Sequence, residues 1–436
     1  MKLYRWLSAA PITTMLLAAF WGIYSSPRIT SVQAADETHV FEYATIYTSP
    51  TEPPIKDGVI VIRNGKIAAV GAFGSISIPS GVKPYGCKDR FITAGFQNSH
   101  VHFEPGKWDD PAHQPAAQLR HHLEDMLSRY GVTIAVDTGS VLQNTLAIRK
   151  RIESGEVRGP RILTAGGPLY PPDDIPYYLR DRIPPEIQKL MAQPETPEAA
   201  VKAVDHNLDN GADLIKLFTG SWVERGKVKP MPVEVAKAAV EEAHRRARLV
   251  FTHPSNLEGL KVALEAHVDV LAHAVEDLRG WDASYLARMK AANMALIPTL
   301  ILFSDNDNIE DILKEVGDYQ RAGGQILFGT DVGYLSDYSP QKEYELMARA
   351  GLTPMQILAS LTTAPAERFG EASRRGRIAP GMEADLVVLY DDPAKDPKNF
   401  SNVCATYRAG RAIYLTGSFE SGGAVGICPG NAVHYR

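Results

Sequence analysis

The sequence predicts an α/β fold in which a (β/α)8 TIM barrel carries a small β-sandwich domain. Through the middle of the chain, short apolar runs alternate with helical patterns, as expected for a parallel sheet with crossover helices. At both ends, β-branched runs are separated by glycine turns, which is typical of antiparallel strands. The chain has 436 residues, of which 44% are hydrophobic and 22% are charged. This is sufficient for one large barrel and an accessory domain.

Residues 1–34 are predicted to be a signal peptide. Lys2 and Arg5 precede an apolar stretch over residues 6–24, and the small-residue pattern Val32-Gln33-Ala34 provides a cleavage site. An uncleaved anchor is the alternative, because the stretch is nearly long enough to cross a bilayer. Its polar breaks and the cleavage pattern favour removal. We therefore expect an exported protein, periplasmic or secreted, with no stable membrane anchor after cleavage.

The charge of the chain argues against nucleic acid as a partner. The formal net charge is −5, and removal of residues 1–34, which hold three positive and no negative side chains, changes it to −8. A surface of this sign does not attract phosphate backbones. We expect a small-molecule substrate, and self-association into a homo-oligomer stays open.

The chain has three cysteines, Cys87, Cys404 and Cys428, which are too few and too far apart for a zinc ribbon. Their odd number leaves at least one of them without a partner inside the chain. One disulfide is compatible with an oxidising compartment. Because Cys87 and Cys404 both fall in segments assigned to the small domain, that pair is expected if a disulfide forms.

The small domain is expected to form from residues 35–90 together with residues 376–436. The first segment contains two β-rich runs, 58–62 and 66–70, joined by the hairpin dipeptide Asn64-Gly65. The second segment has a similar pattern, with β-branched runs and glycine turns at residues 376–378, 384–389, 405–407 and 413–414. We expect the two segments to pair into one β-sandwich.

Residues 91–375 are expected to form the barrel. Helical patterns, for example 197–208, 232–247 and 256–266, separate apolar strand-like runs at residues 132–136, 161–164, 214–218, 249–252, 270–272, 295–298 and 326–328. With the run before His100, these make eight strands. The active sites of such barrels lie at the C-terminal ends of the strands. Residues at those positions are therefore the candidates for function.

Four histidines and one aspartate stand at these strand ends. His100 and His102 are two residues apart, so both imidazoles project from the same face of the first strand. His253 and His273 each close a strand, and Asp331 follows the last one. Imidazole nitrogens together with a carboxylate suit zinc and its neighbours in the first transition row. The cluster predicts a metal centre in which Asp331 also transfers protons.

Lys216 lies within the apolar run 214–218, where a charged side chain is out of place. A buried lysine must pair, lose its proton or be chemically modified, because an isolated ammonium is costly in a low dielectric. A neutral amine can capture carbon dioxide and become a carbamate, an anion able to bridge two cations. A structural ion pair and a Schiff-base nucleophile are the alternatives, and the surrounding histidines favour the carbamate.

These residues, in this order and context, resemble the binuclear members of the amidohydrolase superfamily. The chain looks like the imidazolonepropionase-like and prolidase-like branch of metal-dependent hydrolases. Its small-domain segments 61–71 and 376–388 also resemble those of the family, so that the likeness covers about residues 59–414. The barrel motifs that carry the resemblance are Ser99-His100-Val101-His102, Ile215-Lys216, Thr252-His253, Ala272-His273 and Gly329-Thr330-Asp331.

The resemblance implies a centre of two divalent metal ions, with zinc favoured. A hydroxide shared by the two ions would attack the substrate, since two cations lower the pKa of water towards neutrality. The implied ligand set is His100, His102 and Asp331 for the more buried ion, His253 and His273 for the more exposed ion, and a carbamate on Lys216 as the bridge.

The implied reaction is hydrolysis of an amide-type C–N bond by an exported amidohydrolase. A cyclic amide, an N-acyl amino acid and a short peptide all fit this chemistry. Esterase or phosphotriesterase activity on the same site is an alternative, because the same nucleophile can attack either centre. A non-catalytic exported barrel that binds a metal or a small ligand is another, since the fold does not decide the function.

Two positions depart from the family pattern. The family often has Asp two residues before the first His, where this chain has Asn98, so a carboxylate that could support a metal ligand is missing. Dipeptidase-type relatives carry Ser-Gly-Gly after the lysine strand, whereas this chain has Phe218-Thr219-Gly220-Ser221-Trp222. Dipeptide specificity is therefore not implied.

Several other residues are secondary candidates. Asp137 ends the second strand and fits either support of a metal ligand or bonding within its own loop. Five residues in expected loops above the barrel mouth could touch substrate, namely Trp108, Tyr177, Tyr178, Arg180 and Trp222. The histidines in or near helical segments are expected to bind no metal, namely His113, His121, His122, His206, His244 and His267.

Overall fold

The computed structural model describes residues 38–416 except 105, 173, 174, 181 and 184. The expected signal peptide at residues 1–34 and the third cysteine, Cys428, lie outside the described residues. Within the described part of the chain, no helix is both long and apolar enough to cross a membrane.

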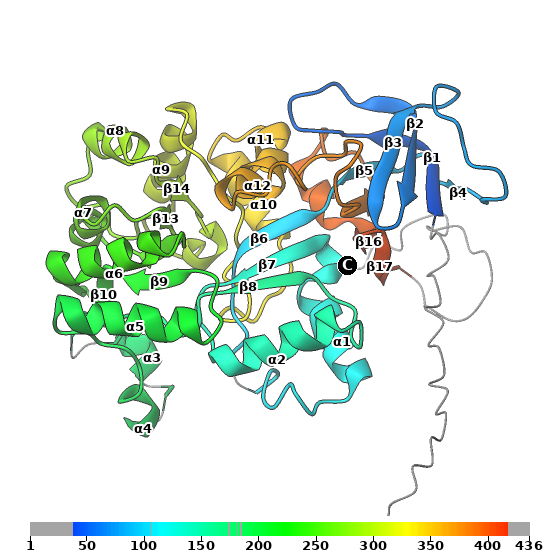
Figure 1. Cartoon of the computed structure of the whole chain (residues 1–436). Coiled ribbons are helices and arrows are strands. Elements are labelled where there is room, and N and C mark those ends of the chain that lie inside the picture. The colour runs from blue at the N-terminus through cyan, green and yellow to red at the C-terminus, as the bar shows by residue number, and fades with distance from the viewer. Residues whose placement is uncertain (1–37, 105, 173–174, 181, 184, 417–436) are drawn as a thin grey trace, which may run out of the picture. The chain divides into compact units, whose positions relative to one another are not determined.

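Two parallel sheets contain the strands of the middle segment (Figure 1). All of these strands fall at the expected apolar runs, and all except β8 (Arg161–Thr164), which is half-buried, are buried, as strands covered on both faces are. The first sheet has the order β6 (Phe96–Val101), β7 (Val132–Asp137) and β8 (Arg161–Thr164). The second has the order β9 (Ile215–Phe218), β12 (Val250–His253), β13 (Val270–Leu271) and β14 (Ala295–Leu296).

Isolated bridges connect the two sheets. Leu169, which follows β8, forms a parallel bridge with Leu217 of β9. The predicted eighth strand, residues 326–328, forms a parallel bridge to β14 but no regular strand. On its other side, the N–H of Ser99 in β6 donates to the carbonyl of Phe328 at 2.8 Å. The segment that leads to Asp331 therefore lies beside the strand that carries His100.

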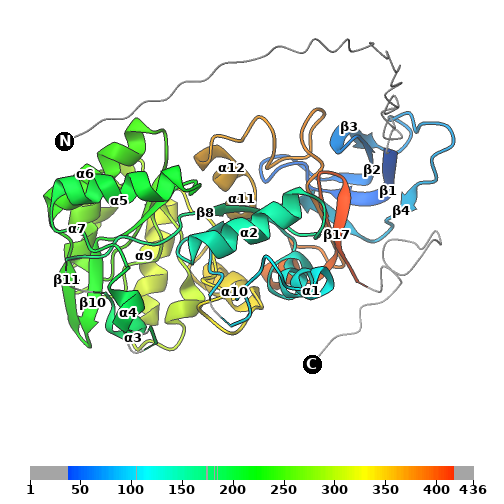
Figure 2. The same cartoon turned by 60° about the horizontal axis from the view of Figure 1, so that its bottom comes forward.

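Helices follow most of the strands, and Figure 2 shows the hairpin of β10 (Gly220–Glu224) and β11 (Lys227–Pro230) near α3, which contacts β10. The longer helices are α1 (Ala116–Met126), α2 (Leu142–Glu153), α5 (Pro197–Asp209), α6 (Val233–Arg245), α7 (Leu257–Glu265), α8 (Ala283–Ala291), α9 (Ile309–Arg321), α10 (Gln341–Arg349), α11 (Pro354–Leu361) and α12 (Thr363–Arg368). The short ones are α3 (Tyr177–Arg180), α4 (Pro185–Gln188), η1 (Ser128–Tyr130), η2 (Leu300–Phe303) and η3 (Pro397–Ser401).

Local sequence explains where several helices begin. The Thr196 side chain accepts the N–H of Ala199 at the start of α5, with a proline in the first turn. The Asn256 side chain caps α7 in the same way. At α11, Thr353 and Gln356 form a reciprocal capping box. These caps satisfy N–H groups that a helix leaves without partners, so the helix starts are defined by the chain itself.

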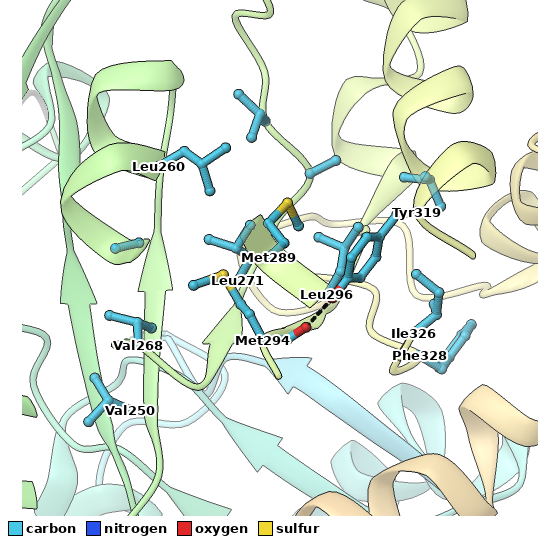
Figure 3. Packing of buried hydrophobic residues seen from close by; sticks show 14 of the residues in the cluster. Val250, Leu260, Val268, Leu271, Met289, Met294, Leu296, Tyr319, Ile326 and Phe328 are labelled. Carbon is cyan, nitrogen blue, oxygen red and sulfur yellow. Dashed lines mark hydrogen bonds between the residues drawn. The ribbon is translucent and has the colours of Figure 1, made fainter. Parts of the chain in front are cut away.

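The largest apolar cluster packs helices against the parallel strands (Figure 3). Leu271 of β13 and Leu296 of β14 lie among side chains from α7, α8 and α9, including Leu260 and Met289. The hydroxyl of Tyr319 donates to the Met294 carbonyl, so its polar atom is satisfied inside the cluster. Burial of each aliphatic side chain contributes about 1.5–3 kcal/mol. The strands whose ends carry the candidate residues are thus held in place by tight packing against these helices.

The two end segments meet in one eight-stranded sheet (Figure 1). Its order is β17-β16-β15-β5-β1-β2-β3, and β4 pairs with β1. Asn64 and Gly65 both have positive φ at the β2–β3 turn, as their hairpin role requires. The strands are β1 (Thr38–Ile46), β2 (Ile55–Arg63), β3 (Lys66–Ala72), β4 (Tyr85–Gly86), β5 (Phe91–Ala94), β15 (Leu386–Leu389), β16 (Val403–Arg408) and β17 (Arg411–Leu415).

The predicted pairing of Cys87 with Cys404 is wrong. Cys87 is a buried free thiol, whereas Cys404 is in a disulfide. Cys87 follows β4, which pairs only with β1 among the described strands, and β5 and β15 separate β1 from β16, where Cys404 lies. Membership of one domain is not sufficient, since a disulfide needs Cα atoms within about 7 Å. Burial raises the pKa of the Cys87 thiol to about 12, so it stays protonated.

Candidate active site

The structure brings all six predicted metal ligands to one cavity of about 1310 Å³. Five of them are at most 7% exposed, and the sixth, His102, has a side chain that is 15% exposed. They come from different elements. These are His100 in β6 and His102 just after it, Lys216 in β9, His253 at the end of β12, His273 after β13 and Asp331 after residues 326–328.

His100, His102 and Asp331 have the spacing of ligands to one metal ion. The two Nε2 atoms are 3.2 Å apart, and Asp331 Oδ1 lies 3.2 Å from Nε2 of His100 and 2.9 Å from Nε2 of His102. Zinc–ligand bonds of about 2.0–2.1 Å in tetrahedral geometry separate the ligand atoms by roughly 3.3 Å. The three atoms therefore fit around a divalent ion without rearrangement.

A hydrogen bond fixes which nitrogen His102 presents. Its Nδ1 lies 2.7 Å from the carbonyl oxygen of Gly139. A carbonyl only accepts, so Nδ1 carries a proton, and in the neutral ring Nε2 is left with the lone pair. A metal-bound histidine typically shows this arrangement, with its second nitrogen donating to a carbonyl or carboxylate.

Asp137 bonds the loop that supplies this carbonyl. Its carboxylate accepts the N–H of Gly139 at 3.1 Å and the hydroxyl of Ser140 at 2.6 Å. It also accepts hydroxyls from Thr145 and Thr164, both at 2.8 Å. Of the two roles expected for Asp137, the hydrogen bonds within its own loop are the ones that its carboxylate forms directly. Through Gly139 it also supports His102.

Asn98 occupies the place where the family often has Asp, and it connects the two halves of the ligand cluster. Its Nδ2 donates to Thr330 Oγ1 at 2.8 Å, next to Asp331. Its Oδ1 accepts the N–H of His100 at 3.2 Å. An amide can donate and accept at once, so Asn98 links the β6 backbone to the Asp331 segment.

The backbone around Asp331 is unusual. Asp331 has a φ of 59°, in the left-handed region that favours glycine. Its N–H donates to the carbonyl of His100 at 3.0 Å. Gly333 has a φ of 103°, and a Cβ there would lie 1.9 Å from the carbonyl oxygen of His102. Burial raises the pKa of Asp331, but His100 and His102 outweigh this and hold the pKa below its usual value.

His253 and His273 adjoin the first three ligands. The two rings have centroids 4.4 Å apart, and the His273 ring is 4.5 Å from that of His100. One ligand atom each from His100, His273 and Asp331 lie within 4.8 Å of one another. Burial lowers the pKa of His100 to about 3 and the pKa values of His253 and His273 well below their ordinary value. These imidazoles are neutral at pH 7, as metal binding requires.

Lys216 lies in the floor of the cavity and is 2% exposed. Among the described residues, no hydrogen bond or ion pair involves its Nζ, and the Phe218 ring lies 5.7 Å away. Burial lowers the pKa of Lys216 to about 7, although Asp331 opposes the shift. A large fraction of the amine is therefore neutral near pH 7.

The outer cavity has an aromatic wall. Tyr177, Tyr178 and Trp222 line the cavity, as expected for residues near the substrate. Trp108 does not, because it is 2% exposed and packs edge-on against Phe103. Arg180 is not part of the lining and donates to a backbone carbonyl. Lining residues that sequence reasoning missed include Glu104, Tyr170, Arg182, Glu276, Phe303 and Tyr334.

Of these, only Glu104 carried a signal in the sequence, since it follows His102 by two residues. The others reach the cavity from loops whose course depends on the whole fold, so that no local pattern indicates them.

The amidohydrolase family matches residues 91–413 of the chain. This chain belongs to the amidohydrolase family. Among curated proteins, the amidohydrolase is 24% identical over 418 residues to ochratoxinase from Aspergillus niger, with 85% of each chain covered. Membership of this family makes it a hydrolase that acts on carbon–nitrogen bonds.

Solved structures share the fold of this amidohydrolase. A Xaa-Pro dipeptidase with bound methionine in its active site has a TM-score of 0.74 at 21% identity, covering 87% of this chain and all of the other. Molinate hydrolase has a TM-score of 0.69 at 19% identity, covering 86% and 94%. Ochratoxinase has a TM-score of 0.72 at 20% identity, covering 88% and 96%. These likenesses indicate a TIM-barrel-like fold with an extra domain.

Proposed function

We propose that this amidohydrolase hydrolyses an amide C–N bond with the help of two divalent ions, with zinc favoured. The observation that carries the proposal is the convergence of six ligand-type side chains in one cavity, three of them at ligand spacing. In the proposed centre, one ion is held by His100, His102 and Asp331, the other by His253 and His273, and a carbamate on Lys216 bridges them.

When bound, the ions would lower the pKa of a water molecule and polarise the scissile carbonyl. Asp331 would move the proton. It is a carboxylate within the ligand cluster, so it lies where it could accept the proton that the attacking water loses. As the C–N bond breaks, it would return that proton to the departing nitrogen.

The carbamate on Lys216 is supported by the burial of an amine that has no hydrogen-bond partner among the described residues. A neutral amine adds to carbon dioxide, forms a C–N bond and releases one proton, which leaves an anion with two oxygens. Such an anion would replace an unpaired buried ammonium by a charge that two cations neutralise.

The cavity wall favours a substrate with a bulky apolar group. Val141, Ile187 and Leu190 line the cavity although they are 51%, 50% and 80% exposed. Large exposed apolar side chains beside a reacting centre are typical of ligand surfaces. We propose an N-acyl amino acid or short peptide with an apolar side chain, or a cyclic amide of similar character.

Two further proposals concern the chain as a whole. We propose that residues 1–34 direct export to the periplasm or the outside of the cell and are then removed, which the disulfide at Cys404 supports because disulfides persist in oxidising compartments. The intact mass of the purified protein tests removal of residues 1–34. A mass that corresponds to a chain starting at Met1 would contradict it.

We also propose that the parallel strands close into a (β/α)8 barrel. The isolated bridges Leu169–Leu217 and Leu296–Ile326 support this closure.

The purified protein, loaded with zinc, should be screened against N-acyl amino acids, dipeptides, lactams, carboxylic esters and phosphotriesters. We expect turnover of amides that rises with the size of the apolar group, and two metal ions per chain by elemental analysis. His100→Ala should lose metal and activity. His113→Ala is the matched control, since His113 is an exposed histidine paired with Asp110. Turnover of esters or phosphotriesters alone would overturn the amide assignment, and the absence of bound metal would overturn the centre.

A further inference from the structure

Thr299 has a backbone conformation that β-branched residues rarely adopt. Its φ is 46° and its ψ is 49°, in the left-handed region. The residue is fully buried and follows Pro298 after β14. Such a conformation costs about 1–3 kcal/mol and persists only where the surrounding structure imposes it. The strain therefore points to contacts that hold Thr299 and to a use for its side chain.

Glu343 of α10 holds the backbone that directly follows Thr299. Its carboxylate accepts the N–H of Leu300 at 2.9 Å and the N–H of Ile301 at 2.8 Å. The side chain is fully buried, and among the described residues no lysine, arginine or histidine pairs with it. The backbone of η2 is thus what this carboxylate binds. Two hydrogen bonds from one rigid helix fix the chain on the C-terminal side of Thr299.

The conformation places the Thr299 hydroxyl against His273. Oγ1 of Thr299 lies 2.8 Å from Nδ1 of His273 and donates its one proton to the carbonyl of Pro298, also at 2.8 Å. Nδ1 is then the donor to the hydroxyl, because the hydroxyl proton is already used. With its proton on Nδ1, His273 has its lone pair on Nε2.

We infer that Thr299 is a positioning residue that fixes the tautomer and the orientation of His273, and that Glu343 keeps Thr299 in the conformation this requires. The inference rests on the proposed metal centre, in which His273 binds an ion through Nε2. Removing the partner of the second nitrogen of a metal-bound histidine lowers metal affinity by about 10–100-fold. A threonine with a merely structural role would change thermal stability and leave metal affinity unchanged.

Thr299→Val tests the hydroxyl, because valine has nearly the same shape and the same backbone strain. We expect its affinity for one of two zinc ions, measured by chelator competition, to fall about 10–100-fold. Thr299→Ser should bind within threefold of the wild type. Thr406→Val is the control. Thr406 is a buried threonine in β16, and its hydroxyl also donates to a backbone carbonyl, that of Ser128. Wild-type affinity in Thr299→Val, or equal loss in Thr299→Ser, would overturn the inference.

Glu343→Gln tests the support of Thr299 and covers the case in which Thr299→Val does not fold. Glutamine keeps the shape but replaces one acceptor oxygen with a donor, so we expect weaker binding of the same ion. If Glu343 acts through Thr299, the losses in the double variant are smaller than the sum of the single losses. Additive losses, or unchanged affinity in Glu343→Gln, would overturn the role of Glu343. A wild-type protein that binds no metal would instead overturn the proposed centre itself.

Discussion

The substitution Gly333→Ala tests whether the backbone near Asp331 sets the geometry of the site. A Cβ at residue 333 would lie 1.9 Å from the carbonyl oxygen of His102, and real Cβ atoms essentially never approach closer than 3.0 Å. The contact must therefore open by at least about 1.1 Å, the difference between these two distances. The blocking atom is backbone, so no flexible side chain can absorb the shift. The backbone itself must therefore move, and this movement disturbs the hydrogen bond of 2.8 Å from the N–H of His102 to the carbonyl of Val332, which joins the two segments.

This displacement has a calculable effect. Misplacement of about 1 Å costs roughly 10²-fold in rate when reacting groups must be aligned. We therefore expect kcat/KM to fall about 10²-fold, together with weaker binding of the ion proposed for His100, His102 and Asp331. Alanine at a φ of 103° adds strain of about 1–3 kcal/mol, which lowers the free energy of unfolding.

The assay compares Gly333→Ala with Gly381→Ala. Gly381 has a φ of 88°, and a Cβ there would meet nothing within 4 Å, so its variant has a similar backbone cost without the clash. Kinetics on the best amide substrate, metal content and thermal unfolding are measured for both. If Gly333→Ala keeps both ions and a kcat/KM within threefold of Gly381→Ala, the link between this backbone and the site is refuted.

Three further predictions follow, two at the candidate site and one at Glu315, a buried carboxyl group that does not line the cavity. Asp331→Asn should keep much of its metal and lose about 10²–10⁴-fold in kcat, and near-normal kcat with both ions retained would contradict a proton-transfer role. Lys216→Ala should lose metal and activity, with partial rescue by bicarbonate or short carboxylic acids, whereas borohydride trapping of a carbonyl substrate on metal-free wild type would reject the carbamate. Burial raises the pKa of Glu315, a carboxylate that accepts the N–H of Val275, to about 8 from 4.5. Because the folded chain then binds this proton more tightly than the unfolded chain, the stabilisation is present below pH 4.5 and is lost as pH rises through 8. Glu315→Gln cannot ionise, so its free energy of unfolding should fall less between pH 5 and 9 in urea titrations, and an equal fall would contradict the assignment.

Features that depend on short-range pattern could be predicted from the sequence. The i, i+2 spacing of His100 and His102 places both rings on the same side of the chain at the end of β6, and the structure has their Nε2 atoms 3.2 Å apart. Asn64-Gly65 indicated a hairpin because both residues tolerate positive φ, and the turn joins β2 to β3. In each case the backbone geometry follows from two or three neighbouring residues.

Features that depend on distant segments could not be predicted. Trp108 was a secondary candidate for contact with substrate, but it is buried in the core, and an aromatic residue in a loop has the same local pattern whether it faces a cavity or the core. Nothing in the local sequence indicates the role of Thr299, because Glu343, which binds the backbone after it, lies far along the chain. The cysteine pairing was wrong for the same reason, since strand order and not sequence distance decides which side chains meet.

The sheet built from both ends of the chain has a consequence for how the protein folds. Ala94 of β5 pairs with Leu386 of β15, although about 290 residues separate them. Bringing the ends of a flexible loop of that length together costs about 5 kcal/mol in chain entropy. Once the intervening segment has folded, most of that cost has already been met, so we expect β5 and β15 to pair late. Pulse-labelling hydrogen exchange during refolding should protect amides of β7 before those of β15, and the reverse order would contradict this. Until the last strands of the chain arrive, the edge of β5 stays open to pairing with other chains.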